Sequence, residues 1–174
     1  MAQHVTVIEH NPIWEQMYSS ESIKIREILG ENCVEIFHIG STAVKGLKAK
    51  PIIDIMPVVK DLACVDELAD KFEKLGYEYL GEFGIIGRRY MHKGGDKRTH
   101  QIHIFQKDDR INIERHIAVR DFLRNHEEIA NQYGMLKEKL ALQYPYDIEK
   151  YCDGKDEFVK QLELQALRWK YKGW

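Results

Sequence analysis

The sequence predicts an α+β protein in which helices pack on a mixed β-sheet and a helical extension forms the C-terminal part. Segments with strand character are concentrated in residues 34–106, and residues 110–172 show helical spacing. This segregation of strands and helices along the chain is typical of α+β folds. A length of 174 residues fits the usual size of one domain, so we expect a single domain over residues 1–174.

The first predicted elements flank a glycine turn. A helix is expected over residues 11–29, where Gly30 ends the helical spacing of apolar residues. Residues 34–39 read as a strand and lead into a tight turn at 40–42. Residues 51–59 are apolar on both faces, which predicts a buried strand in the interior of the sheet.

The remaining elements are predicted from caps, spacing and turn residues. Asp61 is expected to cap one helix over residues 62–75. Glycine-containing turns then separate short strands, and the last third is helical. The strands are expected at 77–80, 88–93 and 100–106, and the helices at about 113–124, 129–140 and 158–169.

The composition restricts the class of protein. Subtracting 28 acidic from 26 basic residues gives a net charge of −2, whereas a duplex-binding protein usually has a clear basic excess. Apolar runs are far too short to span a bilayer, so no membrane partner is expected. Three widely spaced cysteines fit neither a disulfide framework nor a zinc site, and the N-terminus shows no signal-peptide pattern. We therefore expect a cytoplasmic protein, and the oligomeric state stays open.

A glycine turn and an aspartate carry the predicted chemistry. Strand 34–39 delivers Gly40 and Ser41 to a turn, and the next strand brings Asp54 back beside it. Gly40 permits close approach of a ligand, and the Ser41 hydroxyl with the following amides can bind a phosphate. Asp54 would hold Mg²⁺ on that phosphate, as in metal-assisted phosphoryl or nucleotidyl transfer. The alternatives are a plain turn and a structural ion pair at Asp54.

This turn and aspartate resemble the DNA polymerase beta-type nucleotidyltransferases, in which a Gly-Ser turn precedes Asp-x-Asp or Asp-x-Glu. More closely, nearly the whole chain resembles the GrpB family. The matching stretches are residues 38–54, 81–90, 98–103, 115–123, 133–141 and 155–158. The resemblance implies a nucleotidyltransferase-like fold with an extra helical tail. It implies less about activity, although a related domain is fused to dephospho-coenzyme A kinases in some bacteria.

Several positions depart from the pattern of the family. The second carboxylate of the superfamily pair would fall at position 56, which is Met56, and a thioether is a poor ligand for Mg²⁺. Glu82, in the glycine loop, is the candidate that would join Asp54 as a metal ligand; a solvated loop acid is the alternative. The other departures are Lys45, Ile86 and Gln101.

Four further residues complete the expected site. Lys50, Arg88 and Arg120 are expected to bind phosphate or stabilise its charge, and His103 is expected to act as an acid or base. Strand alternation sends Arg88 and Arg89 to opposite faces, and Arg88 is the one expected at the site. Each residue also has a structural alternative. Arg88 would be an exposed charge on an edge strand, His103 a core histidine bonded to the backbone, and Arg120 part of a solvated helix face. One cleft is expected to contain Gly40, Ser41, Lys50, Asp54, Arg88 and His103.

Two functions fit this set of residues best. The first is a nucleotidyltransferase-like protein that acts on or binds a nucleotide or phosphorylated small molecule, with a degenerate carboxylate pair at Asp54 and Met56. The alternative is an inert module that binds a nucleotide or a coenzyme A-like anion, and a third reading is a helical interaction protein. We expect at most one Mg²⁺, bound weakly and with help from a bound phosphate. Nucleic acid is not expected as a partner.

Overall fold

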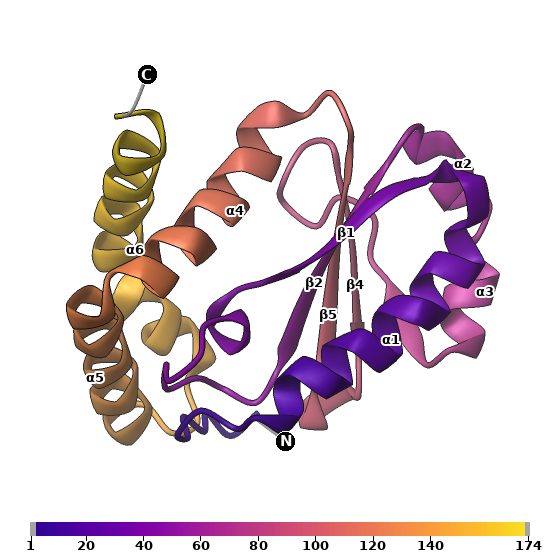
Figure 1. Ribbon diagram of the computed structural model, residues 1–174. Coiled ribbons are helices and arrows are strands. Elements are labelled where there is room, and N and C mark those ends of the chain that lie inside the picture. Colours follow the sequence, from indigo (N-terminus) through magenta and orange to yellow (C-terminus); the bar gives the residue numbers. More distant parts are fainter. Residues whose placement is uncertain (1–2, 173–174) are drawn as a thin grey trace.

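A computed structural model describes residues 3–172 and confirms the α+β fold class (Figure 1). Within these residues a five-stranded sheet has the order β1-β2-β5-β4-β3. β2 and β5 run parallel and the other neighbours are antiparallel, so the sheet is mixed. The strands are β1 Cys33–Ile39, β2 Ile53–Val59, β3 Tyr77–Tyr79, β4 Arg88–Lys93 and β5 His100–Gln106. β2 lies in the interior and is almost entirely buried, as its apolar sequence predicts.

The helices follow the predicted order, with one correction. They are α1 Ile13–Leu29, α2 Leu62–Asp66, α3 Ala69–Lys74, α4 Arg110–Asn125, α5 Glu127–Gln143 and α6 Ile148–Tyr171. Asp61 does cap a helix, because its side chain accepts from the Ala63 N–H. The single helix expected after it is wrong: the Leu68 N–H bonds to the Val65 carbonyl, and this tighter turn separates α2 from α3. Val65 and Phe72 are both buried in the main core.

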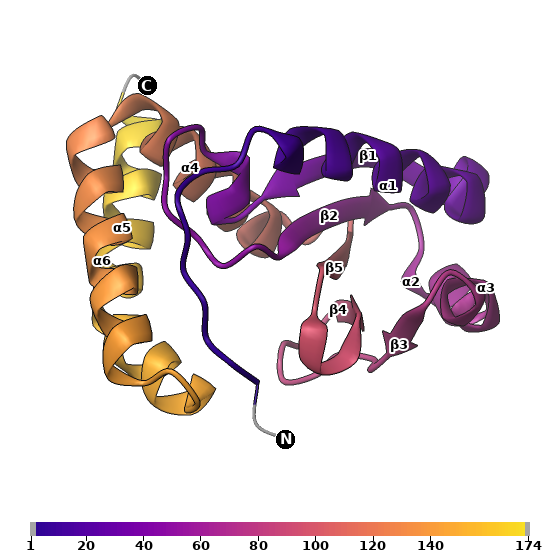
Figure 2. The ribbon, with the colours of Figure 1, turned by 90° about the horizontal axis from the view of Figure 1, so that it is seen from below.

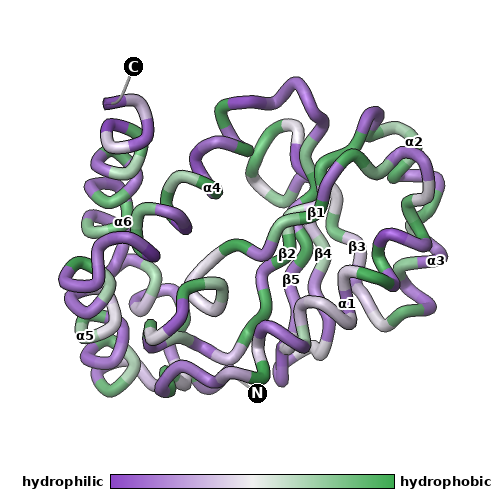
Figure 3. Tube along the Cα trace, in the orientation of Figure 1, coloured by the Kyte–Doolittle hydropathy of each residue, from purple (hydrophilic) through white to green (hydrophobic). Residues whose placement is uncertain are grey.

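Alternation along the strands gives the sheet two different faces. One face carries residues such as Ile53, Ile55 and Ile102, which pack against α1, α2 and α3 in the main core. The hydrophobic stretches of β1, β2 and β5 meet in the middle of the view in Figure 3. The other face carries Asp54 and Met56, and α4 covers part of it. Figure 2 shows α1 along β1 and β2, with α5 and α6 at the far end of the molecule.

Helices α4, α5 and α6 pack together beside the turn that follows β1. Val44 and Leu47, which come shortly after that turn, are buried with Phe122, Tyr133 and Leu162 of the three helices. The turn therefore lies at the junction between the sheet and the helices. Within residues 3–172, no helix combines the length and apolar character needed to cross a membrane.

A buried carboxylate ties α1 to strands β3 and β4 of the sheet. Glu21 is 4% exposed, and its Oε1 accepts from the Tyr77 hydroxyl at 2.8 Å and from Lys93 Nζ at 2.9 Å. Burial would raise the pKa of Glu21, but the hydrogen bonds from Lys93 and Tyr77 outweigh it and hold the pKa below its ordinary value.

Replacing this carboxylate should lower stability and change its pH dependence. Glu21→Gln leaves the Lys93 ammonium without a counter-charge, so we expect a loss of about 1–3 kcal/mol at neutral pH. Because the folded pKa is depressed, the carboxylate stabilises the fold above the unfolded-state pKa, and this contribution is lost as the pH falls through the folded pKa. Urea unfolding from neutral to acid pH should show a smaller loss in the variant. The exposed Glu27→Gln is the control, and an equal loss at both positions would contradict the role of the network.

Candidate functional site

The turn after β1 lies directly against Asp54. Gly40 has φ 73° and ψ −172°, a conformation that favours glycine, and Ser41–Ala43 form a single 3-10 turn. Ile39 pairs with Asp54 across β1 and β2. A Cβ atom on Gly40 would lie 2.7 Å from Oδ2 of Asp54. A glycine is therefore required for the turn to approach the carboxylate this closely.

A cavity of about 130 Å³ opens beside Ser41 and Asp54, and we call it the lysine cavity. Lys50 reaches it from the segment before β2, Lys137 from α5 and Lys155 from α6. The rest of its lining is Thr42, Ala49, Ile52, Gln101 and Tyr151. The structure thus brings together three of the predicted residues, Ser41, Lys50 and Asp54. Sequence interpretation missed Lys137 and Lys155.

Lys137 is buried without a counter-charge. It is 2% exposed, and its Nζ donates to Ser41 Oγ at 2.7 Å. Within residues 3–172 no carboxylate pairs with it, and its Nζ lies 4.3 Å from the centroid of the Tyr133 ring. Burial, followed by the charges of Lys155 and Lys50, holds the pKa of Lys137 well below the ordinary lysine value. One sequence signal was available, because Lys137 lies on the buried stripe of α5 four residues after Tyr133.

The other two lysines face one aromatic ring. The Nζ atoms of Lys50 and Lys155 lie 5.3 and 5.4 Å from the centroid of Tyr151. Burial, and then the charge of Lys155, lowers the pKa of Lys50, and Asp54 offsets part of this shift. Three lysine side chains therefore surround a cavity that has one carboxylate, Asp54, among its described lining residues.

A hydrogen-bonded chain lies behind that carboxylate. His103 Nε2 is 3.0 Å from Asp54 Oδ1, and His103 Nδ1 is 3.4 Å from Arg88 Nη1. A guanidinium can only donate, so Nδ1 accepts and the ring proton lies on Nε2, directed at Asp54. Both nitrogens of His103 are engaged in this way. In this structure His103 orients Asp54 and is not among the residues that line the lysine cavity.

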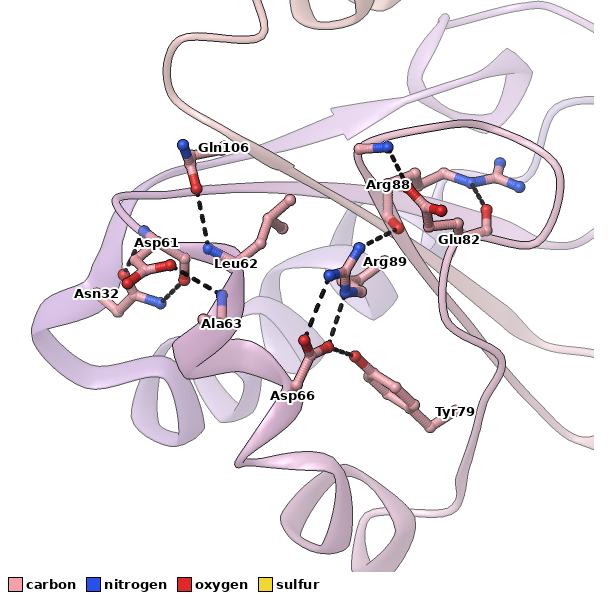
Figure 4. Close-up of polar contacts among 11 residues, drawn as sticks. Asn32, Asp61, Leu62, Ala63, Asp66, Tyr79, Glu82, Arg88, Arg89 and Gln106 are labelled. Carbon is pink, nitrogen blue, oxygen red and sulfur yellow. Dashed lines mark hydrogen bonds and ion pairs between the residues drawn. The ribbon is translucent and has the colours of Figure 1, made fainter.

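Arg88 and Arg89 point to opposite faces of the sheet, as strand alternation predicts (Figure 4). Arg88 is 8% exposed, and its guanidinium donates to the carbonyls of Glu82 and Phe83 at 3.2 and 2.7 Å. Arg89 pairs with Asp66 of α2 at 2.7 Å. Arg88 therefore does not line the lysine cavity, because the glycine loop and His103 take up its donors.

The carboxylates do not fit a two-ion metal site. Glu82 is exposed, and its Oε2 accepts from the Gly87 N–H at 2.6 Å within the same loop (Figure 4). Met56 is fully buried in a cluster with Phe105, where a second carboxylate of the pair would stand. Among residues 3–172, no group of three His, Cys, Asp or Glu side chains could hold a metal ion. The expected pairing of Glu82 with Asp54 is not formed, because the loop amide binds the Glu82 carboxylate.

Metal titration tests this interpretation. We expect calorimetry of the ligand-free protein with Mg²⁺ to show no tight site, because Asp54 alone offers a hard oxygen ligand at the strand. Met56→Asp places a carboxylate on the same face as Asp54, and we expect it to create divalent-ion binding that Met56→Leu does not. Tight binding of two Mg²⁺ ions by the unsubstituted, ligand-free protein would contradict the account.

Arg120 belongs to a neighbouring cavity of about 160 Å³ that also touches Gly40 and Ser41. Its Nη2 is 2.9 Å from Asp121 Oδ1, and its Nη1 donates to the carbonyl of His38 at 3.3 Å. The cavity is lined mainly by side chains of α4, α5 and α6. Arg120 therefore holds the end of β1 from the helical side. It does not reach the lysine cavity, where the sequence analysis expects it to bind phosphate.

The other side of the turn is held by a neutral histidine. His38 Nε2 lies 2.9 Å from Thr42 Oγ1, and the ring stacks on Tyr18. Burial lowers the pKa of His38 to about 4, so the ring is uncharged at neutral pH. Thr42 also lines the lysine cavity, so this contact fixes one wall of it.

The fold is that of the nucleotidyltransferases. The structure of a cytoplasmic RNA terminal U-transferase superposes on 75% of this chain and 40% of its own, with a TM-score of 0.53 and 10% sequence identity. At this identity the likeness concerns the fold alone.

The family is shown more directly, and the chain belongs to the GrpB family. The family model described as GrpB protein matches residues 4–165. The crystal structure of the conserved protein GrpB from Enterococcus faecalis is 46% identical, with a TM-score of 0.93 over 95% of this chain and 99% of that one. The protein YqkA of Bacillus subtilis is 41% identical over 95% of this chain, which spans only 48% of YqkA.

A shorter match links part of the chain to a kinase. The dephospho-CoA kinase of Mycobacterium leprae is 35% identical over 80 residues, which make up 42% of this chain and 20% of that protein. The shared segment is therefore a small part of the kinase.

Proposed function

We propose that this protein binds the phosphate groups of a nucleotide or another phosphorylated small molecule in the lysine cavity. The observation that supports this most directly is Lys137, a buried lysine side chain that lacks a carboxylate partner and points at the Ser41 hydroxyl. A lysine buried without a counter-charge is costly in either charge state, and such costs are typical of sites where a ligand supplies the missing charge. Asp54 does not supply it, because within residues 3–172 no ion pair joins its carboxylate to Lys137, and its Oδ1 bonds to His103 instead.

The surroundings of Lys137 suit an oxyanion. Lys50 and Lys155 add two cations, and Ser41 adds a hydroxyl at the start of a turn whose first N–H groups have no partner within the turn. Hydrogen bonds to charged groups contribute about 1.5–3 kcal/mol each. A cavity of about 130 Å³ favours a single phosphate-sized group over a nucleic-acid strand. We place the protein in the cytosol, which suits its unpaired cysteines.

Transfer of a nucleotidyl or phosphoryl group is a second candidate function. The nucleotidyltransferase fold supports it, and so does the place of Asp54 beside the proposed phosphate. Ser41 and the lysines would hold the phosphate chain, and His103 would keep the Asp54 carboxylate oriented toward an acceptor hydroxyl. Because Met56 stands where the second carboxylate would be, we expect transfer to be slow or absent. The alternative is therefore an inert binding module, for which the kinase match suggests a coenzyme A-like ligand.

A ligand panel tests the proposal. Thermal unfolding should be followed with pyrophosphate, nucleoside triphosphates, coenzyme A and sugar phosphates, each with and without Mg²⁺, and with adenosine as the unphosphorylated control. A ligand at a hundred times its Kd should stabilise the fold by about 2.7 kcal/mol. Ser41→Ala should weaken the binding about tenfold, since it removes one charge-assisted hydrogen bond. If no phosphorylated compound raises the midpoint at millimolar concentration, the proposed function is wrong.

A further inference from the structure

The charge state of Lys137 is the feature of the lysine cavity that the proposed function leaves unexplained. We propose that anion binding in this cavity is coupled to the uptake of one proton by Lys137, which is an uncharged amine in the free protein and an ammonium in the complex. This inference rests on the proposed function, and it adds a pH dependence to the same site.

The groups around Lys137 disfavour an ammonium in the empty cavity. Lys50 lies before β2 and Lys155 on α6, so two cations approach from two separate elements. The rings of Tyr133 and Tyr151 come from α5 and α6. The acid on this side, Asp54 of β2, is shared with His103. With Lys137 2% exposed, bulk water solvates a third positive charge there poorly.

The contact with Ser41 is compatible with both charge states. Lys137 Nζ lies 2.7 Å from Ser41 Oγ, and either an amine or an ammonium can donate an N–H to that oxygen. The side chain therefore needs no new rotamer when it gains a proton. An incoming dianion supplies the counter-charge that Asp54 does not, and this favours the charged form.

The uptake of a proton on binding determines how the affinity for the anion changes with pH. If the complex holds one proton more than the free protein, the affinity falls as the pH rises. Between the pKa of Lys137 in the free protein and its pKa in the complex, the Kd should rise about tenfold per pH unit. Outside this interval the Kd should be independent of pH.

Sulfate is a suitable probe, because it keeps both negative charges across the neutral range and cannot itself take up the proton. Calorimetric titration with sulfate should be done at one neutral pH in two buffers of different ionisation enthalpy. We expect the measured heat to differ between the buffers by an amount that corresponds to uptake of up to one proton. Equal heats with clear binding would overturn the inference and leave the proposed function standing. No binding of sulfate or of any phosphorylated compound would overturn both.

Two substitutions assign the proton to Lys137. Lys137→Arg carries a permanent charge, so it should bind sulfate with no proton uptake. Lys137→Met should lose measurable binding, whereas Lys139→Met, an exposed position on the same helix, should behave as the parent. Proton uptake that persists in Lys137→Arg would assign the proton to another group and overturn the inference.

A direct measurement covers the case in which Lys137→Arg does not fold. In NMR spectra of protein with labelled lysine side chains, one Nζ should titrate well below the other lysines, and sulfate should raise its pKa. If all lysine side chains are charged at neutral pH without sulfate, the inference is wrong.

Discussion

Replacing Gly40 with alanine is expected to destabilise the protein by about 3 kcal/mol or more and to abolish phosphate binding. At φ 73° and ψ −172° a side-chain-bearing residue is strained. The added Cβ would also lie 2.7 Å from Asp54 Oδ2 and 3.2 Å from Asp54 Cβ. Relief requires the turn or the Asp54 carboxylate to shift, and either movement disturbs the cavity between Ser41 and Asp54. Urea unfolding measures the first effect and calorimetry with sulfate the second.

Gly46 is a control that distinguishes the cost of backbone strain from the cost of the contact with Asp54. Gly46 also has a positive φ, 84°, but a Cβ there would meet no atom within 4 Å. Gly46→Ala should cost only about 1 kcal/mol and leave sulfate binding intact. If the two substitutions cost the same, the contact between Gly40 and Asp54 does not constrain the turn as we describe.

Replacing Lys137 with methionine is expected to stabilise the ligand-free protein by about 1–3 kcal/mol while it abolishes phosphate binding. The substitution removes a buried amine that has no counter-charge and keeps most of the side-chain volume. A substitution that raises stability and abolishes binding is typical of a residue whose role is to bind a ligand. Thermal and urea unfolding, with and without sulfate, measure both changes.

The stability gained by Lys137→Met should decrease as the pH rises. The pKa of Lys137 is lower in the folded state than in the unfolded chain, so unfolding takes up a proton between the two values. The parent therefore becomes more stable as the pH rises through this interval, and the advantage of Lys137→Met should shrink. Lys139→Met, an exposed position, should change stability by less than about 0.5 kcal/mol. A destabilised Lys137→Met would contradict the account.

Local patterns in the sequence predicted most of the fold. The apolar run of β2, the Asp61 cap and the alternation that separates Arg88 from Arg89 each depend on neighbours in the chain, and each is found. The break between α2 and α3 could not be predicted from the sequence, because the apolar spacing of residues 62–75 fits one helix and both parts pack in the same core.

The site was predicted less completely, because its cations come from distant parts of the chain. Ser41 and Asp54 were expected together, since β1 and β2 are joined by a short connection. Lys137 meets Ser41 across 96 positions, through the packing of α5 beside the turn. The place of Lys137 on the buried stripe of α5 indicates burial, but nothing near Lys137 or Lys155 in the sequence indicates that they meet Ser41. Glu82 was expected near Asp54, and the bond to the amide of Gly87 in its own loop could not be predicted from composition.

The central claim is that the lysine cavity binds the phosphate of a ligand, and a crystal structure with tungstate tests it most directly. Tungstate resembles phosphate in shape and charge, and its anomalous scattering locates it without ambiguity. The account predicts the strongest anomalous peak within hydrogen-bond distance of Lys137 Nζ and Ser41 Oγ, with Lys50 and Lys155 turned toward it. Tungstate bound elsewhere on the molecule at saturating concentration, with the lysine cavity free of it, would contradict the account.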